Sequence, residues 1–137
     1  MKLAHYYEPI LRLFVSAILG SVIGFERESQ NKPAGLRTHV LVCLASCLVT
    51  IVSITEFPDD PARLLAQIIP GIGFIGAGSI IASGEKVIGI TTATGIFVTS
   101  AIGIAVGTGN YILAIAAVGI VSFVLYSGFL GLKPDSE

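Results

Sequence analysis

Long apolar stretches separated by short polar connectors dominate the pattern of hydrophobic and polar positions along this chain. A helix needs about 20 predominantly apolar residues to cross a bilayer. The connectors hold most of the charged and turn-forming residues, as expected for the ends of crossings. The predicted membrane-spanning helices cover residues 9–25, 38–57, 64–83, 87–107 and 111–132.

The last two helices are predicted from one longer stretch. Residues 87–132 carry no charged side chain and are too many for a single crossing. The turn-forming residues inside the stretch are Gly107-Thr108-Gly109-Asn110, and we divide it there into two helices. Five crossings would place the two chain ends on opposite sides of the membrane. The sequence therefore predicts an all-α, polytopic membrane protein, with residues 1–137 in a single membrane domain of about five transmembrane helices.

Composition supports this fold class. Apolar residues make up 53% of the chain and charged residues 12%, about half the share in soluble domains. A net charge of −1 offers no basic excess for nucleic acid. Cys43 and Cys47 lie one helical turn apart in an apolar stretch, which suits packing better than a disulfide or a zinc site. Soluble enzymes, nucleic-acid binders and disulfide scaffolds are excluded, and we expect neither a metal site nor a cofactor.

Basic residues are unevenly divided between the two predicted sides of the membrane. Lysine and arginine concentrate in cytoplasmic connectors. We therefore expect the N-terminus outside and the C-terminus in the cytoplasm, with Arg12 close enough to the end of its helix to reach the interface. The basic residues are, on the cytoplasmic side, Arg27, Lys32, Arg37, Lys86 and Lys133, and on the other side Lys2, Arg12 and Arg63.

Small residues recur at every fourth position in two of the predicted helices. One series runs through Ser16, Gly20 and Gly24, and the other runs from Thr91 to Gly107. Such series let helix backbones approach closely in a bilayer, although missing side chains can also leave a groove or the wall of a permeation path. The residues for which we expect helix packing are Gly20, Gly24, Gly95, Gly103 and Gly107.

The third predicted helix contains Gly71-Ile72-Gly73-Phe74-Ile75-Gly76, which matches the dinucleotide-binding pattern by letter. No βαβ unit surrounds it and no acidic residue follows at the ribose position, which excludes that function. Pro70 and the glycines can instead break or thin a helix, and irregular backbone at membrane depth must be buried or line a watery cavity. Gly73, Gly76 and Gly78 are therefore candidate functional residues, although a plain helical crossing remains the leading expectation.

The connector between the first two helices concentrates charge beside an otherwise apolar membrane body. Orientation requires only Lys and Arg, yet glutamates interleave with the arginines here, and Pro33 and Gly35 restrict the shape of the loop. A charged network could pin the two helices together or present a contact surface; orientation with interfacial solvation is the alternative. The candidate residues are Glu26, Arg27, Glu28, Lys32, Arg37 and His39.

Taken together, these segments resemble the MgtC/SapB family of bacterial inner-membrane proteins, over about residues 11–122. Because the chain ends at Glu137, we expect the short type, without the family's soluble C-terminal domain. The resemblance adds Asp60, Arg63, Gln67 and Thr91 to the candidate binding residues. The matching motifs are Gly20-x-x-x-Gly24-x-Glu26-Arg27-Glu28, KPAGLRTH at 32–39, Asp60-Pro61-Ala62-Arg63 with Ala66-Gln67, GIGFIGAG at 71–78, and Gly89-Ile90-Thr91-Thr92-Ala93.

The resemblance implies a multi-pass protein of the bacterial inner membrane, linked to magnesium homeostasis and stress adaptation. Two functions stay open. The chain could be a regulatory or interaction protein that contacts another membrane complex, such as the F-type ATP synthase. It could instead be a homo-oligomeric transporter or channel for Mg²⁺ or another small ion. No nucleophile, base and orienting residue occur together, so we expect no enzyme. The expected partners are the lipid bilayer and further copies of the chain.

Overall fold

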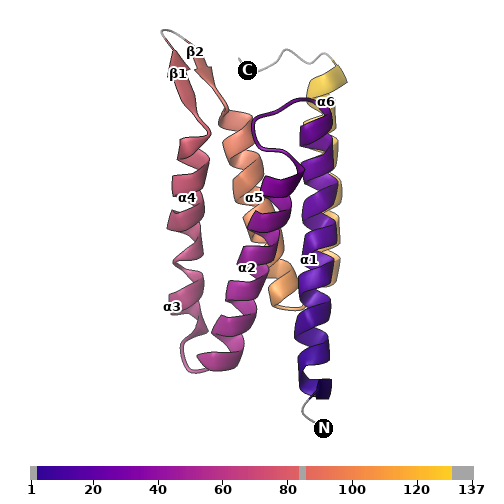
Figure 1. Ribbon diagram of the computed structural model, residues 1–137, viewed down its shortest axis with the longest axis vertical. Coiled ribbons are helices and arrows are strands. Elements are labelled where there is room, and N and C mark those ends of the chain that lie inside the picture. The colour runs from indigo at the N-terminus through magenta and orange to yellow at the C-terminus, as the bar shows by residue number, and fades with distance from the viewer. Residues whose placement is uncertain (1–2, 84–85, 131–137) are drawn as a thin grey trace.

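The computed structural model describes residues 3–83 and 86–130. The chain runs up and down along one long axis as an antiparallel helical bundle, with its described ends at opposite ends of the bundle (Figure 1). The all-α fold class predicted from the sequence is confirmed. In chain order, the elements are α1 (Leu3–Ser29), α2 (Leu36–Glu56), α3 (Pro61–Leu65), α4 (Ile68–Gly78), β1 (Ile81–Ser83), β2 (Lys86–Ile88), α5 (Ile90–Gly107), α6 (Tyr111–Ser127) and η1 (Gly128–Leu130).

Helices α1, α2 and α5 form the core of the bundle. Each packs against the other two, while α6 lies against α1 and α5, and the α3–α4 arm lies at the opposite edge against α2 and α5 (Figure 1). Among the described residues, three helical stretches are long and apolar enough to cross a membrane: Tyr7–Ser29, Leu36–Glu56 and Ile90–Gly107. Helix α6 is shorter, and the α3–α4 arm runs over residues 61–78 in two pieces.

The contact between α2 and α5 depends on glycine. A Cβ atom added at Gly103 would lie 2.3 Å from the carbonyl oxygen of Cys43, and one added at Gly107 would lie 2.6 Å from the Thr50 Cβ. Both distances are far below van der Waals contact, so only glycine lets the two backbones come this close. Gly95 has a looser environment, because its Cβ would lie 3.5 Å from the His39 Nε2.

Helix α1 approaches α2 in the same way. A Cβ at Gly20 would lie 2.8 Å from the Cys43 Cβ, and one at Gly24 would lie 2.7 Å from the Leu36 Cα. Cys43 and Cys47 are fully buried free thiols in the apolar cluster between these helices. Helix α2 is therefore held between two glycine-bearing helices.

The predicted helix over residues 64–83 is wrong near its start and at its end. The chain bends at Ala66 and Gln67, between α3 and α4. Pro70 is the third residue of α4, where its missing N–H is harmless because first-turn N–H groups have no acceptor within the helix. Continuing α3 through Pro70 would have required that N–H to bond the carbonyl of Ala66. The break therefore precedes the glycines, and residues 70–78 are helical.

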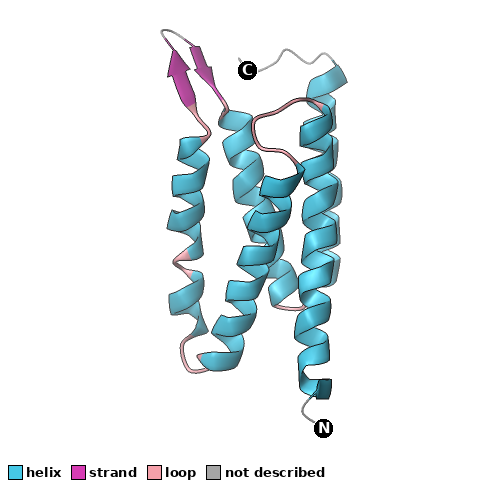
Figure 2. Ribbon diagram, viewed as in Figure 1, coloured by secondary structure: helices cyan, strands magenta, loops and turns pink. Residues whose placement is uncertain are grey.

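A short hairpin replaces the last residues of the predicted helix 64–83 and the first residues of the predicted helix 87–107. Strands β1 and β2 pair antiparallel, with Ile81 opposite Ile88 (Figure 2). Gly89, with φ of +97°, precedes α5, and a Cβ there would lie 2.1 Å from the carbonyl oxygen of Ser79. This left-handed conformation, which favours glycine, prevents α5 from extending backward. Residues 131–132 of the predicted fifth helix lie outside the described residues.

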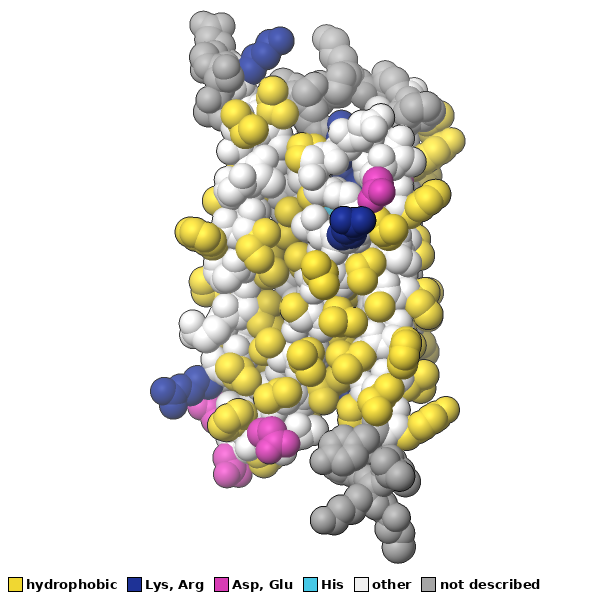
Figure 3. All heavy atoms as spheres, viewed as in Figure 1, with side chains coloured by type: hydrophobic (Ala, Val, Ile, Leu, Met, Phe, Trp, Pro, Cys, Tyr) yellow, Lys and Arg dark blue, Asp and Glu magenta, His cyan; other side chains and the backbone are white. Residues whose placement is uncertain are grey.

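The two ends of the bundle differ in their connectors. We call the end with residues 30–35 and strands β1 and β2 the hairpin end, and the end with residues 57–60 and 108–110 the connector end. Apolar side chains cover the middle of the visible face, and acidic side chains gather at the connector end (Figure 3). The arrangement keeps Arg27, Lys32, Arg37 and Lys86 toward one end and Arg12 and Arg63 toward the other. Lys2 and Lys133 lie outside the described residues.

Candidate functional site

Polar side chains are buried between the three core helices. In the described part of the chain, the buried polar residues all belong to α1, α2 and α5, whereas the outer helices contribute none. One pair, Ser46 and Ser100, joins α2 to α5 through hydroxyls 2.8 Å apart. The bundle therefore has a polar seam as well as an apolar core. Its residues are Ser16, Arg27, His39, Ser46, Thr50, Ser53, Thr92, Thr99 and Ser100.

Arg27 occupies the hairpin end of this seam. It lies in the last turn of α1 and is only 2% exposed. Its Nη2 donates a hydrogen bond to the Thr92 Oγ1, 3.5 Å away in the first turn of α5. Burying a guanidinium is costly unless it is bonded, so this contact fixes how α1 meets α5. The sequence identified Arg27 as a candidate but did not indicate Thr92 as its acceptor.

His39 lies in the first turn of α2 and is fully buried, with its ring toward α5. The ring Nδ1 lies 2.9 Å from the carbonyl oxygen of Gly35 and must donate, because a carbonyl can only accept. Nε2 is buried without a hydrogen-bond partner among the described residues and faces Gly95. Gly95 thus makes room for the imidazole ring.

The two glutamates of the first connector bond locally. The Glu28 Oε2 accepts a hydrogen bond of 2.7 Å from the backbone N–H of Leu36, the first residue of α2. The carboxylate therefore ties the end of α1 to the start of α2 and complements the helix dipole there. The Glu26 Oε1 accepts from the Gln30 Nε2 at 2.5 Å. Both contacts order the loop between the helices.

Arg37 and Lys32 complete the set of charged candidates at the hairpin end. Arg37 is exposed and makes no salt bridge within the described part of the chain, while Lys32 is half-buried. Thr91 is also half-buried, one residue before Thr92. The structure therefore brings Arg27, His39 and Thr92 into the polar seam and leaves Arg37 on the surface.

Of the candidate glycines in the third predicted helix, one packs against α5 and the others have open surroundings. Gly76 is buried, and a Cβ there would lie 3.6 Å from the Ala93 Cβ on α5. Gly71, Gly73 and Gly78 have no protein atom within 4 Å of the position of an added Cβ. Helix α4 consequently packs on α5 through one side and presents an open, glycine-bearing side to its surroundings.

Asp60, Arg63 and Gln67 come together at the connector end. With Phe57 and Leu64 they line a pocket of about 420 Å³. The pocket forms because the chain turns after α2 and enters α3 at once, and the Ser53 Oγ holds this turn by donating to the carbonyl oxygen of Pro61 at 2.5 Å. Sequence reasoning missed Phe57 and Leu64, which supply the apolar walls.

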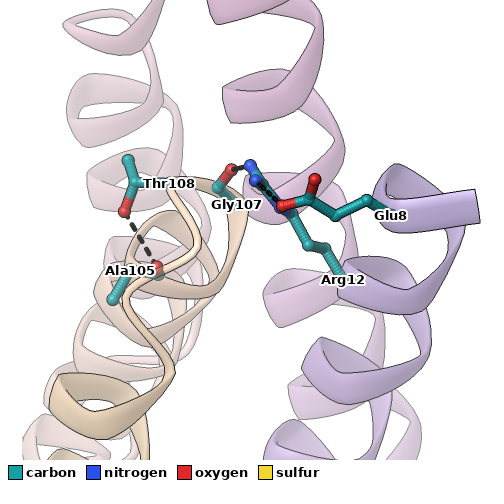
Figure 4. A network of polar contacts seen from close by, with 5 residues as sticks. All are labelled: Glu8, Arg12, Ala105, Gly107 and Thr108. Carbon is teal, nitrogen blue, oxygen red and sulfur yellow. Dashed lines mark hydrogen bonds and ion pairs between the residues drawn. The ribbon is translucent and has the colours of Figure 1, made fainter. Parts of the chain in front are cut away.

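Arg12 also acts in a way that the sequence did not predict. Instead of reaching only toward the interface, its Nη1 donates to the carbonyl oxygen of Gly107 at 2.6 Å, and its Nη2 pairs with Glu8 (Figure 4). Gly107 is the last residue of α5, where helical carbonyls lack partners and cations are favoured. The four-residue spacing from Glu8 was the available signal. Arg12 thus joins α1 to the end of α5.

The described residues contain no group of three or more side chains able to hold a metal ion. The arrangement instead offers two polar regions: a buried seam that ends at Arg27 and His39, and an open pocket at Asp60 and Arg63. The seam joins helices, and the pocket has room for a ligand.

Comparison with known proteins gives consistent matches. The model of the MgtC family matches residues 13–129. The "Putative magnesium transporter YhiD" of Escherichia coli K12 is 46% identical over 117 residues, which are 79% of this chain and 54% of that protein. "Protein SapB" of Bacillus subtilis 168 is 44% identical over 129 residues, 85% of this chain and 56% of its own length.

"Protein MgtC" of Salmonella typhimurium LT2 is 41% identical over 112 residues, which are 82% of this chain and 48% of that protein. The chain spans about half the length of the curated relatives it matches. No solved structure gives a significant match. The family match covers nearly the whole bundle, including both polar regions. This chain therefore belongs to the MgtC family.

Proposed function

We propose that this protein of the bacterial inner membrane supports magnesium homeostasis as a regulatory or interaction protein, and does not conduct ions through its own bundle. The observation that carries the proposal is the contact of α2 with α5, where a Cβ at Gly103 would lie 2.3 Å from the Cys43 carbonyl oxygen. A water-filled path between the core helices would have to separate these backbones. The link to magnesium rests on the family and on the name of the relative YhiD, a "Putative magnesium transporter".

The hairpin end is the proposed contact surface. It carries Lys32, Arg37 and Lys86 around an ordered loop, and the exposed Arg37 makes no salt bridge among the described residues. Basic connectors favour the cytoplasmic side, which would place the N-terminus outside and the C-terminus in the cytoplasm. Another membrane complex, such as the F-type ATP synthase, is the proposed partner.

Cysteine labelling tests this orientation. Membrane-impermeant reagents applied from outside should label cysteines placed at Asp59 and Asn110, which lie at the connector end, but not one placed at Gln30. Cys43 and Cys47 are buried and provide the internal control for intact folding. Labelling at Gln30 alone would reverse the orientation.

Arg37 provides the test of the contact surface. Arg37→Glu combined with Ser29→Lys keeps the number of basic residues in the loop, so insertion should persist while support of growth at low magnesium is lost. Ser29→Lys alone is the matched control and should still support growth, because it leaves Arg37 in place. If the Arg37 variant inserts and supports growth normally, the loop serves only orientation.

A homo-oligomeric transporter or channel for Mg²⁺ or another small ion is the second candidate. The open positions on α4, at Gly71, Gly73 and Gly78, favour it, because several copies could pack around a path that α4 helps to line. Purified protein in liposomes that contain a magnesium indicator separates the two functions. We expect Mg²⁺ entry no faster than in protein-free liposomes.

Saturable entry that Gly73→Leu abolishes would instead establish the transporter. Gly119→Leu is the control for that result, since Gly119 lies on α6 and also has no protein atom within 4 Å of an added Cβ. Entry that both variants reduce equally would argue against a path along α4.

A further inference from the structure

The pocket at the connector end combines opposite charges that do not neutralise each other. Asp60 and Arg63 line the same pocket, yet no salt bridge joins them, and neither pairs with another described residue. Exposed charges often lack partners, but here the two share one cavity whose other walls include the apolar Phe57 and Leu64. The pocket therefore presents a separated carboxylate and guanidinium beside an apolar surface.

Two of the polar side chains stand at helix starts without capping them. Asp60 is the N-cap residue of α3 and Gln67 that of α4, but neither side chain makes the capping hydrogen bond. An N-cap Asp ordinarily accepts a hydrogen bond from a backbone N–H of the first turn. Both side chains are consequently available to a ligand in the pocket.

The position of the pocket relates it to the lipid headgroups. Helix α2 is long and apolar enough to cross a membrane and ends at Glu56, one residue before Phe57. Polar and aromatic residues directly after a crossing lie at the level of the headgroups. Phe57 and Leu64 would then contact the glycerol and upper acyl region, with the charged residues toward water.

We propose that this pocket binds a zwitterionic aminophosphate, the chemistry of the phosphatidylethanolamine headgroup. The carboxylate of Asp60 would accept hydrogen bonds from the primary ammonium, and the guanidinium of Arg63 would donate to the phosphate, which it can bind through two N–H groups. Gln67 can donate to the phosphate or accept from the ammonium. The inference goes beyond the proposed function and does not depend on it.

Simple ions fit the pocket less well. A divalent cation at Asp60 would be repelled by Arg63, and an inorganic anion at Arg63 would be repelled by Asp60. A quaternary ammonium, as in phosphatidylcholine, has no N–H group to donate to the carboxylate. A primary ammonium joined to a phosphate satisfies both side chains.

Native mass spectrometry of the purified full chain can measure this preference. The protein would be titrated with dioleoyl-phosphatidylethanolamine, dioleoyl-phosphatidylcholine and dioleoyl-phosphatidylglycerol, which share their acyl chains. We expect the ethanolamine lipid to bind about tenfold more tightly than the other two, the effect of about one charge-assisted hydrogen bond. Equal binding of the three lipids would overturn the proposal without any variant.

Variants locate the preference in the pocket. Asp60→Asn and Arg63→Gln should each remove most of it, whereas Asp59→Asn, an adjacent exposed carboxylate outside the pocket, should retain it. Release of the buried Cys43 and Cys47 to a thiol-reactive dye reports folding. If either variant melts early, Gln67→Leu, which leaves the start of α3 intact, should still lower the affinity about threefold. A preference that survives all three changes would overturn the proposal.

Soluble competitors identify the source of the ligand. If glycerophosphoethanolamine, which lacks acyl chains, displaces the lipid at comparable concentration, the pocket recognises the headgroup alone and a free aminophosphate is its ligand. If only the intact lipid binds, Phe57 and Leu64 contribute and the ligand is the membrane lipid. Either result supports the aminophosphate chemistry. Displacement by Mg²⁺ or inorganic phosphate alone, at the same concentration, would overturn it.

Discussion

The α2–α5 contact and helix α4 are both rich in glycine, but their glycines lie in opposite surroundings. A Cβ at Gly103 or Gly107 would collide with α2, whereas one at Gly71, Gly73 or Gly78 would meet no protein atom within 4 Å. In the first region glycine lets backbones touch, and in the second the glycines face away from the other helices of the bundle. A series of small residues in the sequence therefore does not reveal by itself which helices are in contact.

The largest effect should come from adding one methyl group in the core. Gly103→Ala should destabilise the bundle by about 1–3 kcal/mol, because the new Cβ forces α5 away from the carbonyl of Cys43. Thermal unfolding followed by exposure of the buried cysteines measures the loss. Gly119→Ala, at an open position on α6, is the control, and equal melting of the two variants would contradict the close α2–α5 contact.

Removing the buried guanidinium should have the next largest effect. Arg27→Ala removes the hydrogen bond to Thr92 and should cost about 2 kcal/mol, the range for hydrogen bonds of charged groups. Arg37→Ala, on the exposed side of α2, should change stability by less than about 0.5 kcal/mol. The same unfolding assay compares them. An equal loss of unfolding free energy in both variants would mean that the buried Arg27 stabilises the bundle no more than the exposed Arg37 does.

The contact of Arg12 with the end of α5 should contribute less. Arg12→Gln should cost about 1 kcal/mol, because it removes a cation from the C-terminal end of a helix. Glu8→Gln breaks only the ion pair, in which the Glu8 side chain is 65% exposed, and should cost about 0.3–0.5 kcal/mol. If Glu8→Gln cost as much as Arg12→Gln, the ion pair and not the carbonyl contact would carry the stabilisation.

The smallest predicted effect has the opposite sign. Gly73→Ala should stabilise the protomer by about 0.5 kcal/mol, since alanine is the better helix former and its methyl group meets open space. The unfolding assay, compared with Gly103→Ala, shows whether the two regions differ in sign. Destabilisation by Gly73→Ala would show that the open side of α4 is covered in the membrane, as the oligomeric transporter requires.

Sequence alone determined the all-α membrane fold class. The length of each apolar stretch and the positions of the charged residues decide which segments can lie in a bilayer. The all-α fold and the order of the long helices followed from these local properties. The family followed from motifs such as KPAGLRTH, which a linear comparison can read. The candidate residues Asp60, Arg63 and Gln67 were found in the same way, although nothing in their spacing predicted a shared pocket.

Tertiary structure decided what each of these residues touches. Arg37 and His39 lie two residues apart on α2, and the positions of α1 and α5 bury His39 and leave Arg37 on the surface. Arg12 meets Gly107 because α5 ends beside the start of α1, a relation between residues far apart in the chain. Contacts of this kind depend on which helix lies opposite, and a pattern along one helix carries no information about its neighbour.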